Sequence, residues 1–282
     1  MNFHLNTAEV YIPDNEPMEQ ALARTTHLCL AAHQDDIEIM AAQPIIECFQ
    51  QKDKWFTGVV VTDGRGSPRN SIYENYSDDE MRLVRFKEQR KAAFVGEFAA
   101  QIMLDIPSKV VKDASRSEPV DDILAILRAT KPKVVYTHNL ADKHDTHVGV
   151  ALRVIEALRK LDPAERPERV VGCEVWRALD WMVDSDKVTM NLSNHENLQL
   201  ALLGVFDSQI VGGKRYDLAS MGRRRANATY FESHDVDDAL ALSYGIDLTA
   251  LMNDASLEPT VFIGEHMQRF VDDVNERILR MS

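Results

Sequence analysis

The sequence has few cysteines, and none stands at the spacing of a disulfide or thiolate metal motif. Cys29, Cys48 and Cys173 are odd in number and form no C-x-x-C pattern. A disulfide framework or a thiolate zinc site requires paired or clustered cysteines. Cys29 and Cys173 stand in apolar, strand-like runs, so we expect buried, reduced thiols.

Basic residues are outnumbered by acidic residues. The chain carries 32 Lys and Arg residues against 45 Asp and Glu residues, for a formal net charge of −13 at pH 7. Nucleic acids and anionic membrane surfaces attract clustered Lys and Arg. The charge balance therefore argues against both as the main partner. One basic run, Arg223–Arg225, is typical of a solvated face.

No apolar stretch reaches the length of a membrane span. Residues 1–20 also lack the basic segment followed by an apolar segment that marks a secretory signal. We therefore expect a cytoplasmic protein without a membrane span. Hydrophobic residues make up 45% of the chain and charged residues 27%, which is typical of a globular protein with a sizeable core.

Strand-like and helix-like segments alternate at short spacing through the first 175 residues. This alternation predicts a Rossmann-like α/β fold, with a mainly parallel sheet and helices on both faces. Pro44 lies inside the first long helical pattern and predicts a kink or a late start there. The predicted strands are 27–32, 56–61, 100–104, 133–136 and 169–175, and the predicted helices are about 37–51, 79–96, 120–129 and 147–160.

The pattern loosens after Trp176. Helices are predicted near 194–206, 214–230 and 265–279, and no internal repeat or linker is visible. We expect a single domain over residues 1–282, with an α/β core at 26–175 and a C-terminal elaboration at 176–282.

Polar residues collect directly after the predicted strands. In open parallel sheets, ligands bind beyond the carboxyl ends of the strands. A solvated loop explains any one of these groups, but it explains poorly why His and Asp recur at several strand ends. The groups are His33, Asp35 and Asp36 after the first strand, Asp63 and Arg65 after the second, Asp105 after the third, and His138 through His147 after the fourth.

Two of these groups have spacings that favour a metal site. His33 and Asp36 are three residues apart, and so are His144 and His147. Two histidines and one carboxylate with open positions suit Zn²⁺ or Fe²⁺. The neighbours Asp35 and Asp36 point about 100° apart in a helical turn, so a division of labour is expected: one carboxylate ligates and the other stays free as a base.

Taken in order, these motifs resemble the PIG-L/LmbE-like N-deacetylases. The resemblance rests on AHQDDIE, VVVTDGRG, the helix with Arg85 and Glu88, and YTHNLADKHDTH, and it covers roughly residues 26–174. A-H-x-D-D is its most specific part. Members of that family remove acetyl groups from amino sugars of the N-acetylglucosamine type.

The resemblance implies a role for each matching residue. It makes His33, Asp36 and His147 the metal ligands, Asp35 the general base, and His144 the group that stabilises the oxyanion. It implies metal-assisted amide hydrolysis with zinc as the usual ion, and ferrous iron fits these ligands as well. The implied partner is a small amino-sugar substrate, and a homo-oligomer is left open.

The sequence also departs from the family pattern. Gln34 stands where proline is usual, and Met40–Ala42 replaces a common glycine pair. Asp63 and Arg65 are altered in the loop after the second strand, which bears on the substrate more than on the reaction.

Other residues are weighed without a specific family match. Asp63, Arg65, Asp105 and His138 are candidate substrate-binding residues. Arg85 and Glu88, at i,i+3 spacing, are expected to form a structural ion pair.

The sequence is also compatible with two other functions. One is an amidase that acts on a larger amide, such as a thiol conjugate. The other is a metal-free, non-catalytic ligand-binding module built on the same sheet, which would hold no ion.

Overall fold

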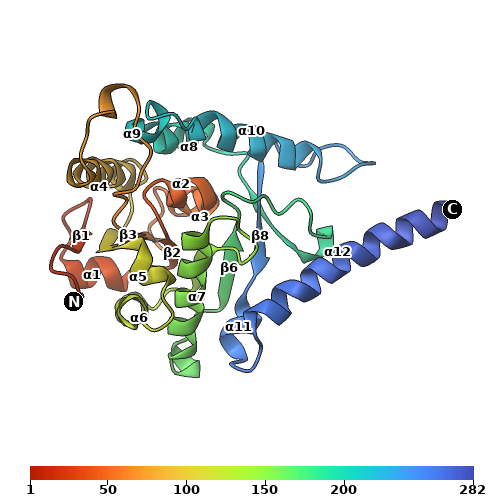
Figure 1. Cartoon of the computed structure of the whole chain (residues 1–282), viewed down its shortest axis with the longest axis horizontal. Helices are drawn as coiled ribbons and strands as arrows, with labels where there is room; N and C mark the ends of the chain where they lie inside the picture. The colour runs from red at the N-terminus through yellow and green to blue at the C-terminus, as the bar shows by residue number, and fades with distance from the viewer.

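A computed structural model describes residues 1–282 and shows a central sheet between two layers of helices (Figure 1). The strands are β1 (Glu9–Tyr11), β2 (His27–Ala31), β3 (Phe56–Thr62), β4 (Ala100–Ile106), β5 (Val134–His138), β6 (Arg169–Cys173), β7 (Lys187–Asn191) and β8 (Leu242–Asp247). The helices are α1 (Met18–Ala23), α2 (Asp36–Met40), α3 (Ala42–Cys48), α4 (Asp78–Val95), α5 (Ser108–Lys112), α6 (Glu118–Thr130), α7 (Asp145–Arg159), α8 (Glu196–Gly204), α9 (Asp207–Ile210), α10 (Tyr216–Thr229), α11 (Thr249–Asn253) and α12 (Pro259–Met281).

The eight strands form one sheet in the order β1-β4-β3-β2-β5-β6-β8-β7. The five central strands, from β4 to β6, pair in parallel. Strand β1 at one edge and strands β8 and β7 at the other pair antiparallel. The predicted α/β fold with a mainly parallel sheet is confirmed. Strands β1, β7 and β8 were not predicted.

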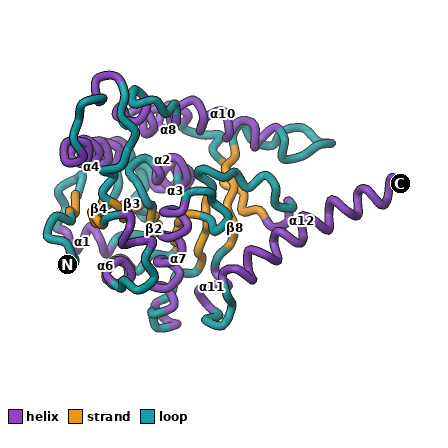
Figure 2. Tube along the Cα trace, in the orientation of Figure 1, coloured by secondary structure: helices purple, strands orange, loops and turns teal.

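Helices cover both faces of the sheet, which is why the central strands are apolar along their whole length. Figure 2 shows the strands enclosed between the two helical layers. One apolar core joins the sheet to α1, α5, α6, α7 and α11, and a second joins it to α2, α3, α4 and α8. Burial on both faces fixes the strands and therefore the loops that follow them.

The predicted helix over 37–51 is two helices, broken at Ala41. Pro44 explains the break, because proline lacks a backbone N–H and its ring clashes with the carbonyl four residues earlier. The break leaves carbonyl groups free at the end of α2. The Arg224 side chain donates hydrogen bonds to two of them, at Glu38 (2.9 Å) and Ile39 (3.1 Å).

This contact corrects the prediction for the arginine run 223–225. Arg224 is 2% exposed, so the expectation of a solvated face is wrong for that residue. Arg225 is exposed and pairs with Glu196, as a surface arginine does. Arg223 donates to the carbonyl of Val175.

The last helix, α12, runs away from the body of the protein and ends at the C-terminus (Figure 1). Only Phe262 of this helix is buried. No helix of the structure combines the length and apolar character that crossing a lipid bilayer demands.

Candidate active site

The site forms where β2 and β5 end side by side. These strands pair in parallel, so the segments that follow them emerge at the same edge of the sheet. His33 and Asp36 follow β2, and His147 lies in the first turn of α7, which follows β5. Strand pairing thus brings together residues that are far apart in the sequence.

Three side chains converge on one point. The Nδ1 atom of His33, the Oδ2 atom of Asp36 and the Nε2 atom of His147 are each 3.2 Å from the other two. Asp36 and His147 are buried, and His33 is partly exposed. These three side chains are called the triad below.

The spacing of the triad fits a metal ion. In a tetrahedral site with bonds of 2.0–2.1 Å, neighbouring ligand atoms lie about 3.3 Å apart. The observed separations of 3.2 Å are close to this value. The donor set, two imidazoles and one carboxylate, is one that zinc and ferrous iron both accept.

Asp142 orients His147. Its Oδ2 atom lies 3.3 Å from Nδ1 of His147, so the ring's other nitrogen, Nε2, faces the triad. The same carboxylate accepts hydrogen bonds from the backbone N–H groups of His144 (3.0 Å) and Trp176 (3.1 Å). A carboxylate behind a ligand histidine is common at metal sites, where it fixes the tautomer and the ring orientation.

The pKa values of Asp36 and His147 are shifted in opposite directions. Burial alone would raise the pKa of Asp36, but the charge and hydrogen bonds of His147 and His33 hold it well below its usual value. Burial opposes the charged form of His147, yet the Asp36 and Asp142 carboxylates raise its pKa to about 9. A cation at this point is therefore favoured by the surrounding groups.

Asp35 lies outside the triad although it is adjacent to Asp36. Its φ angle of 89° is rare for a residue with a side chain, and it directs the two carboxylates to different places. The Oδ2 atom of Asp35 lies 3.4 Å from Nη1 of Arg85. Burial raises the pKa of Asp35 to about 7, and the Arg85 charge limits this rise.

Arg85 and Gln34 support Asp35 from behind. Arg85 is 2% exposed and donates to the carbonyl oxygen of Gln34. The Gln34 side chain packs against Gly64, where a Cβ atom would lie 2.2 Å from Oε1 of Gln34. Gly64 also has a φ of 68°, which glycine adopts without strain. Gln34 thus links the Asp35 turn to the loop after β3.

His144 lies between the triad and the open side of the site. Its ring stacks on His147 at 4.5 Å between centroids and meets His33 edge-on at 5.0 Å. Burial, followed by the His147 charge, lowers the pKa of His144. The Nδ1 atom of His144 is buried and has no hydrogen-bond partner in the protein.

A cavity of about 390 Å³ opens over these groups. His33, Asp35, Asp36 and His144 line its floor, and most of its other lining residues are polar. Its walls come from the loop after β3, from α5 and from the chain between the end of β6 and the start of α10, including Asp63, Lys112, Trp176, Lys214 and Tyr216. This is called the catalytic cavity below.

Residues 28–158, which contain the triad, match the family model described as PIG-L, GlcNAc-PI de-N-acetylase. This segment is a PIG-L domain. No curated protein matches this sequence. The predicted resemblance is confirmed.

Solved structures share the fold of this chain at low sequence identity. An N,N'-diacetylchitobiose deacetylase from Pyrococcus horikoshii is 16% identical with a TM-score of 0.64, over 86% of this chain and 90% of that one. A teicoplanin deacetylase in a zinc-inhibited form is 13% identical with a TM-score of 0.55, over 79% and 97%. A 4-carboxy-2-hydroxymuconate hydratase from Pseudomonas putida is also 13% identical, with a TM-score of 0.56, over 79% and 95%.

The hydratase shows that one fold carries different reactions. At these identities the likeness extends to the fold alone, so the reaction has to be argued from the site.

The other predicted site residues of the PIG-L domain lie at different distances from the cavity. Asp63 lines the cavity, and its Oδ2 lies 3.3 Å from Nε of Arg65. Arg65 also pairs with Asp79 and is not among the lining residues. Asp105 is held by Arg82 through two contacts of 2.6 Å, outside the cavity.

His138 lies beneath the triad. It is fully buried, its Nε2 accepts a 2.8 Å hydrogen bond from the Ala32 N–H, and its ring stacks on His147 at 3.9 Å. Its contacts support the β2 loop and the His147 ring, and it does not line the cavity.

The expected ion pair between Arg85 and Glu88 is absent, and that prediction is wrong. Arg85 faces Asp35, while Glu88 accepts hydrogen bonds from the backbone N–H (2.7 Å) and hydroxyl (2.6 Å) of Ser208. Arg85 and Glu88 both lie on α4, but they contact different parts of the protein.

Sequence reasoning missed several site residues: Arg85, Lys112, Asp142, Trp176, Lys214 and Tyr216. Two of these residues could have been found from the sequence. Arg85 is an arginine on the inward face of a predicted helix, and Asp142 is an aspartate five residues before His147, a proposed ligand. The last three lie beyond the recognised motifs, in the region where the pattern loosens, and no local signal marks them.

Proposed function

We propose that this protein is a metal-dependent hydrolase that removes an acetyl group from an N-acetylated amino sugar or its conjugate. The observation that carries the proposal is the triad, three ligand atoms at metal-site spacing, with a separate buried carboxylate beside it. Those two elements are what amide hydrolysis with an activated water requires.

The ion we propose is zinc, with ferrous iron as the other ion that fits. Held by His33, Asp36 and His147, it would supply Lewis acidity, which polarises an amide carbonyl and makes water more acidic. Asp142 supports this arrangement because it fixes the orientation of His147.

Asp35 is the proposed general base. It lies in the floor of the catalytic cavity, outside the triad, and Arg85 holds it from one side. Its carboxylate accepts a proton from the attacking water and then delivers it to the leaving amine. A pKa near 7 suits a group that takes and returns a proton at neutral pH.

His144 is the proposed oxyanion donor. Its ring lies over the triad, and an N–H aimed at the carbonyl oxygen would stabilise the negative charge that develops there. The low pKa of His144 favours a neutral ring that donates through one N–H.

The catalytic cavity suits a polar substrate of amino-sugar size. A volume of about 390 Å³ falls in the range of small-ligand sites. Asp63 and the hydroxyl of Thr146 line it, and they can bond sugar hydroxyl groups. The three buried, free cysteines support a reducing compartment, and we propose the cytoplasm.

The proposal is tested by measuring acetate released from a panel of N-acetylated sugars, with metal-free protein and with protein given zinc or ferrous iron. Each metal is titrated up to and beyond one equivalent, since one teicoplanin deacetylase is described in a zinc-inhibited form. We expect acetate release that requires about one metal equivalent. Binding of less than about a tenth of an equivalent after reconstitution would contradict the proposal.

A further inference from the structure

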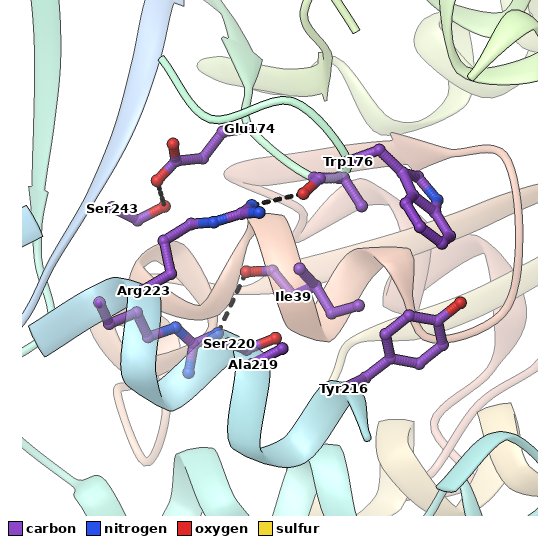
Figure 3. A pocket seen from close by; sticks show the side chains of 10 residues that line it. Ile39, Glu174, Trp176, Tyr216, Ala219, Ser220, Arg223 and Ser243 are labelled. Carbon is purple, nitrogen blue, oxygen red and sulfur yellow. Dashed lines mark hydrogen bonds between the residues drawn. The ribbon is translucent and has the colours of Figure 1, made fainter. Parts of the chain in front are cut away.

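A second cavity adjoins the catalytic cavity. It has a volume of about 140 Å³ and lies between α2, the segment after β6, α10 and β8. Its walls are mainly apolar and are formed by Ile39, Val175, Trp176, Tyr216 and Ala219. Figure 3 shows the Trp176 and Tyr216 rings together at one end of this cavity, with Glu174, Ser243 and Arg223 at the other. It is called the side cavity below.

The side cavity lies beside the catalytic cavity. Trp176 and Tyr216 line both cavities, and their rings meet edge-on at 6.1 Å between centroids. Ile39 follows the triad residue Asp36 by one turn of α2, which places it about 4.5 Å further along the helix axis. A group bound here would therefore belong to a part of the substrate close to the scissile amide.

Glu174 and Arg223, at the end of the side cavity opposite the Trp176 and Tyr216 rings, have hydrogen-bond partners in the protein. Glu174 accepts hydrogen bonds from the backbone N–H groups of Leu179 (3.0 Å) and Tyr244 (3.1 Å) and from the Asn227 amide (2.7 Å). Arg223 donates to the carbonyl of Val175, and its charge offsets that of Glu174. These contacts engage Glu174 and one N–H of Arg223 within the protein, and the walls are mainly apolar, so we infer that apolar contact decides most of what binds.

The volume sets the size of the ligand group. A dry apolar cavity of about 150 Å³ holds one benzene molecule, which has six non-hydrogen atoms. The methyl group of an acetyl substituent would fill only a small part of such a space. A larger apolar group gains free energy by displacing water from these walls.

We propose that the side cavity binds an apolar substituent of about six non-hydrogen atoms, carried by the substrate next to its scissile amide. The substituent is either an N-acyl chain longer than acetyl or an apolar aglycone. This inference rests on the proposed amide hydrolysis. An apolar aglycone would narrow the proposed substrate class, whereas a longer N-acyl chain would replace the acetyl group as the group removed.

Binding of reaction products to zinc-loaded protein tests the side cavity without turnover. The probes for calorimetry are hexanoate against acetate, for the acyl source, and phenyl against methyl β-glucosaminide, for the aglycone source. We expect the larger member of one pair to bind at least about tenfold more tightly. Equal affinities within both pairs would overturn the inference.

Two variants on α10 link any preference to this cavity. Ala219→Phe places a ring in the cavity, and Leu218→Phe adds the same ring at an exposed neighbour that does not line it. We expect the preference to disappear in the first variant and to persist in the second. Ser220→Leu fills the cavity from a second position if Ala219→Phe does not fold. A preference that survives filling from both positions would contradict the assignment.

Hydrolysis of the matching N-acetyl and N-hexanoyl substrates, measured in parallel, separates the two proposals. Tighter binding of a larger product without any metal-dependent hydrolysis overturns the proposed function and leaves the side cavity supported. Hydrolysis with no preference in binding or in kcat/KM overturns the side cavity alone.

Discussion

Asp35 and Asp36 are neighbours in the chain, but their carboxylates occupy separate environments. The Oδ2 atom of Asp36 lies 3.2 Å from ligand atoms of both His33 and His147, whereas the Oδ2 atom of Asp35 lies 3.4 Å from the Arg85 guanidinium. The φ angle of 89° at Asp35 produces this separation. One carboxylate can hold an ion while the other stays free to move a proton.

Asp35→Asn should retain the metal and lose turnover. An amide cannot accept the water proton, so we expect kcat to fall by about 10²- to 10⁴-fold at unchanged metal content. Metal analysis and acetate release are measured on the same preparation. Asp36→Asn is the matched comparison, and it should lose the metal. Near-wild-type turnover in Asp35→Asn would contradict the base assignment.

Asp142→Asn should weaken metal binding although Asp142 is not a ligand. Its carboxylate fixes the His147 ring from behind, and loss of such a partner lowers metal affinity by about 10- to 100-fold. Competition with a chelator measures the change. Asp145→Asn serves as the control, because Asp145 is exposed at the start of α7. An unchanged metal affinity in Asp142→Asn would show that Asp142 does not support metal binding.

Gly64→Ala should destabilise the loop that contacts Gln34. The new Cβ would lie 2.2 Å from Oε1 of Gln34, and the φ of 68° is strained for alanine. We expect a loss of about 1–2 kcal/mol in the free energy of unfolding, measured by denaturant titration. Gly66→Ala is the control because no atom lies within 4 Å of its added Cβ. Equal stabilities of the two variants would count against the tight fit.

Stability should fall as pH rises because of Glu88. Burial raises the pKa of this carboxyl, against the hydrogen bonds from Ser208. An unfolded glutamate titrates near about 4.3, so the folded state holds the proton more tightly. The stability that this proton contributes is complete below the unfolded pKa and is lost as pH rises through the folded pKa.

Glu88→Gln tests this linkage, since glutamine does not titrate. We expect the difference in Tm, variant minus wild type, to grow between pH 4.5 and pH 7. Glu276→Gln, on the exposed part of α12, controls for the change in net charge. Parallel pH profiles for Glu88→Gln and the wild type would disprove the linkage.

We propose that residues 1–282 form one domain. The carboxylate of Glu174, at the end of β6, accepts hydrogen bonds from Asn227 and Tyr244, and β8 pairs with β6. A fragment ending at Val175 would lose these partners and expose the edge of β6. We expect it to lack a cooperative thermal transition by circular dichroism. A cooperative transition in the fragment would divide the chain into two domains.

The sequence predicted the central strands and the motifs that follow them, because each is a continuous local pattern. The break between α2 and α3 follows from Pro44 in the same way. Arg224 could not be predicted, since its place depends on carbonyl groups that this break leaves free in a distant segment. Strand β7 was missed because it is an edge strand with mixed burial, and β8 was missed because its short segment, with a serine and a glycine, has no strong apolar pattern although it is buried between β6 and β7.

The same contrast between local patterns and long-range packing applies to the site. His33, Asp36 and His147 stand in short motifs and could be selected from the sequence. Trp176 and Tyr216 reach the cavity only through the packing of α10 against β8 and the preceding segment, a relationship between distant parts of the chain. The proposed metal ligands were therefore easier to predict than the residues proposed to contact the substrate.

The pairing of β2 with β5 determines when the proposed metal site forms during folding. His33 and Asp36 are more than 100 positions from His147, and β3, β4 and the long helices α4 and α6 lie between them in the sequence. No local segment of the nascent chain holds all three ligands. We therefore expect the sheet to form before an ion meets the complete set of proposed ligands, whereas a zinc finger folds only when its ion binds.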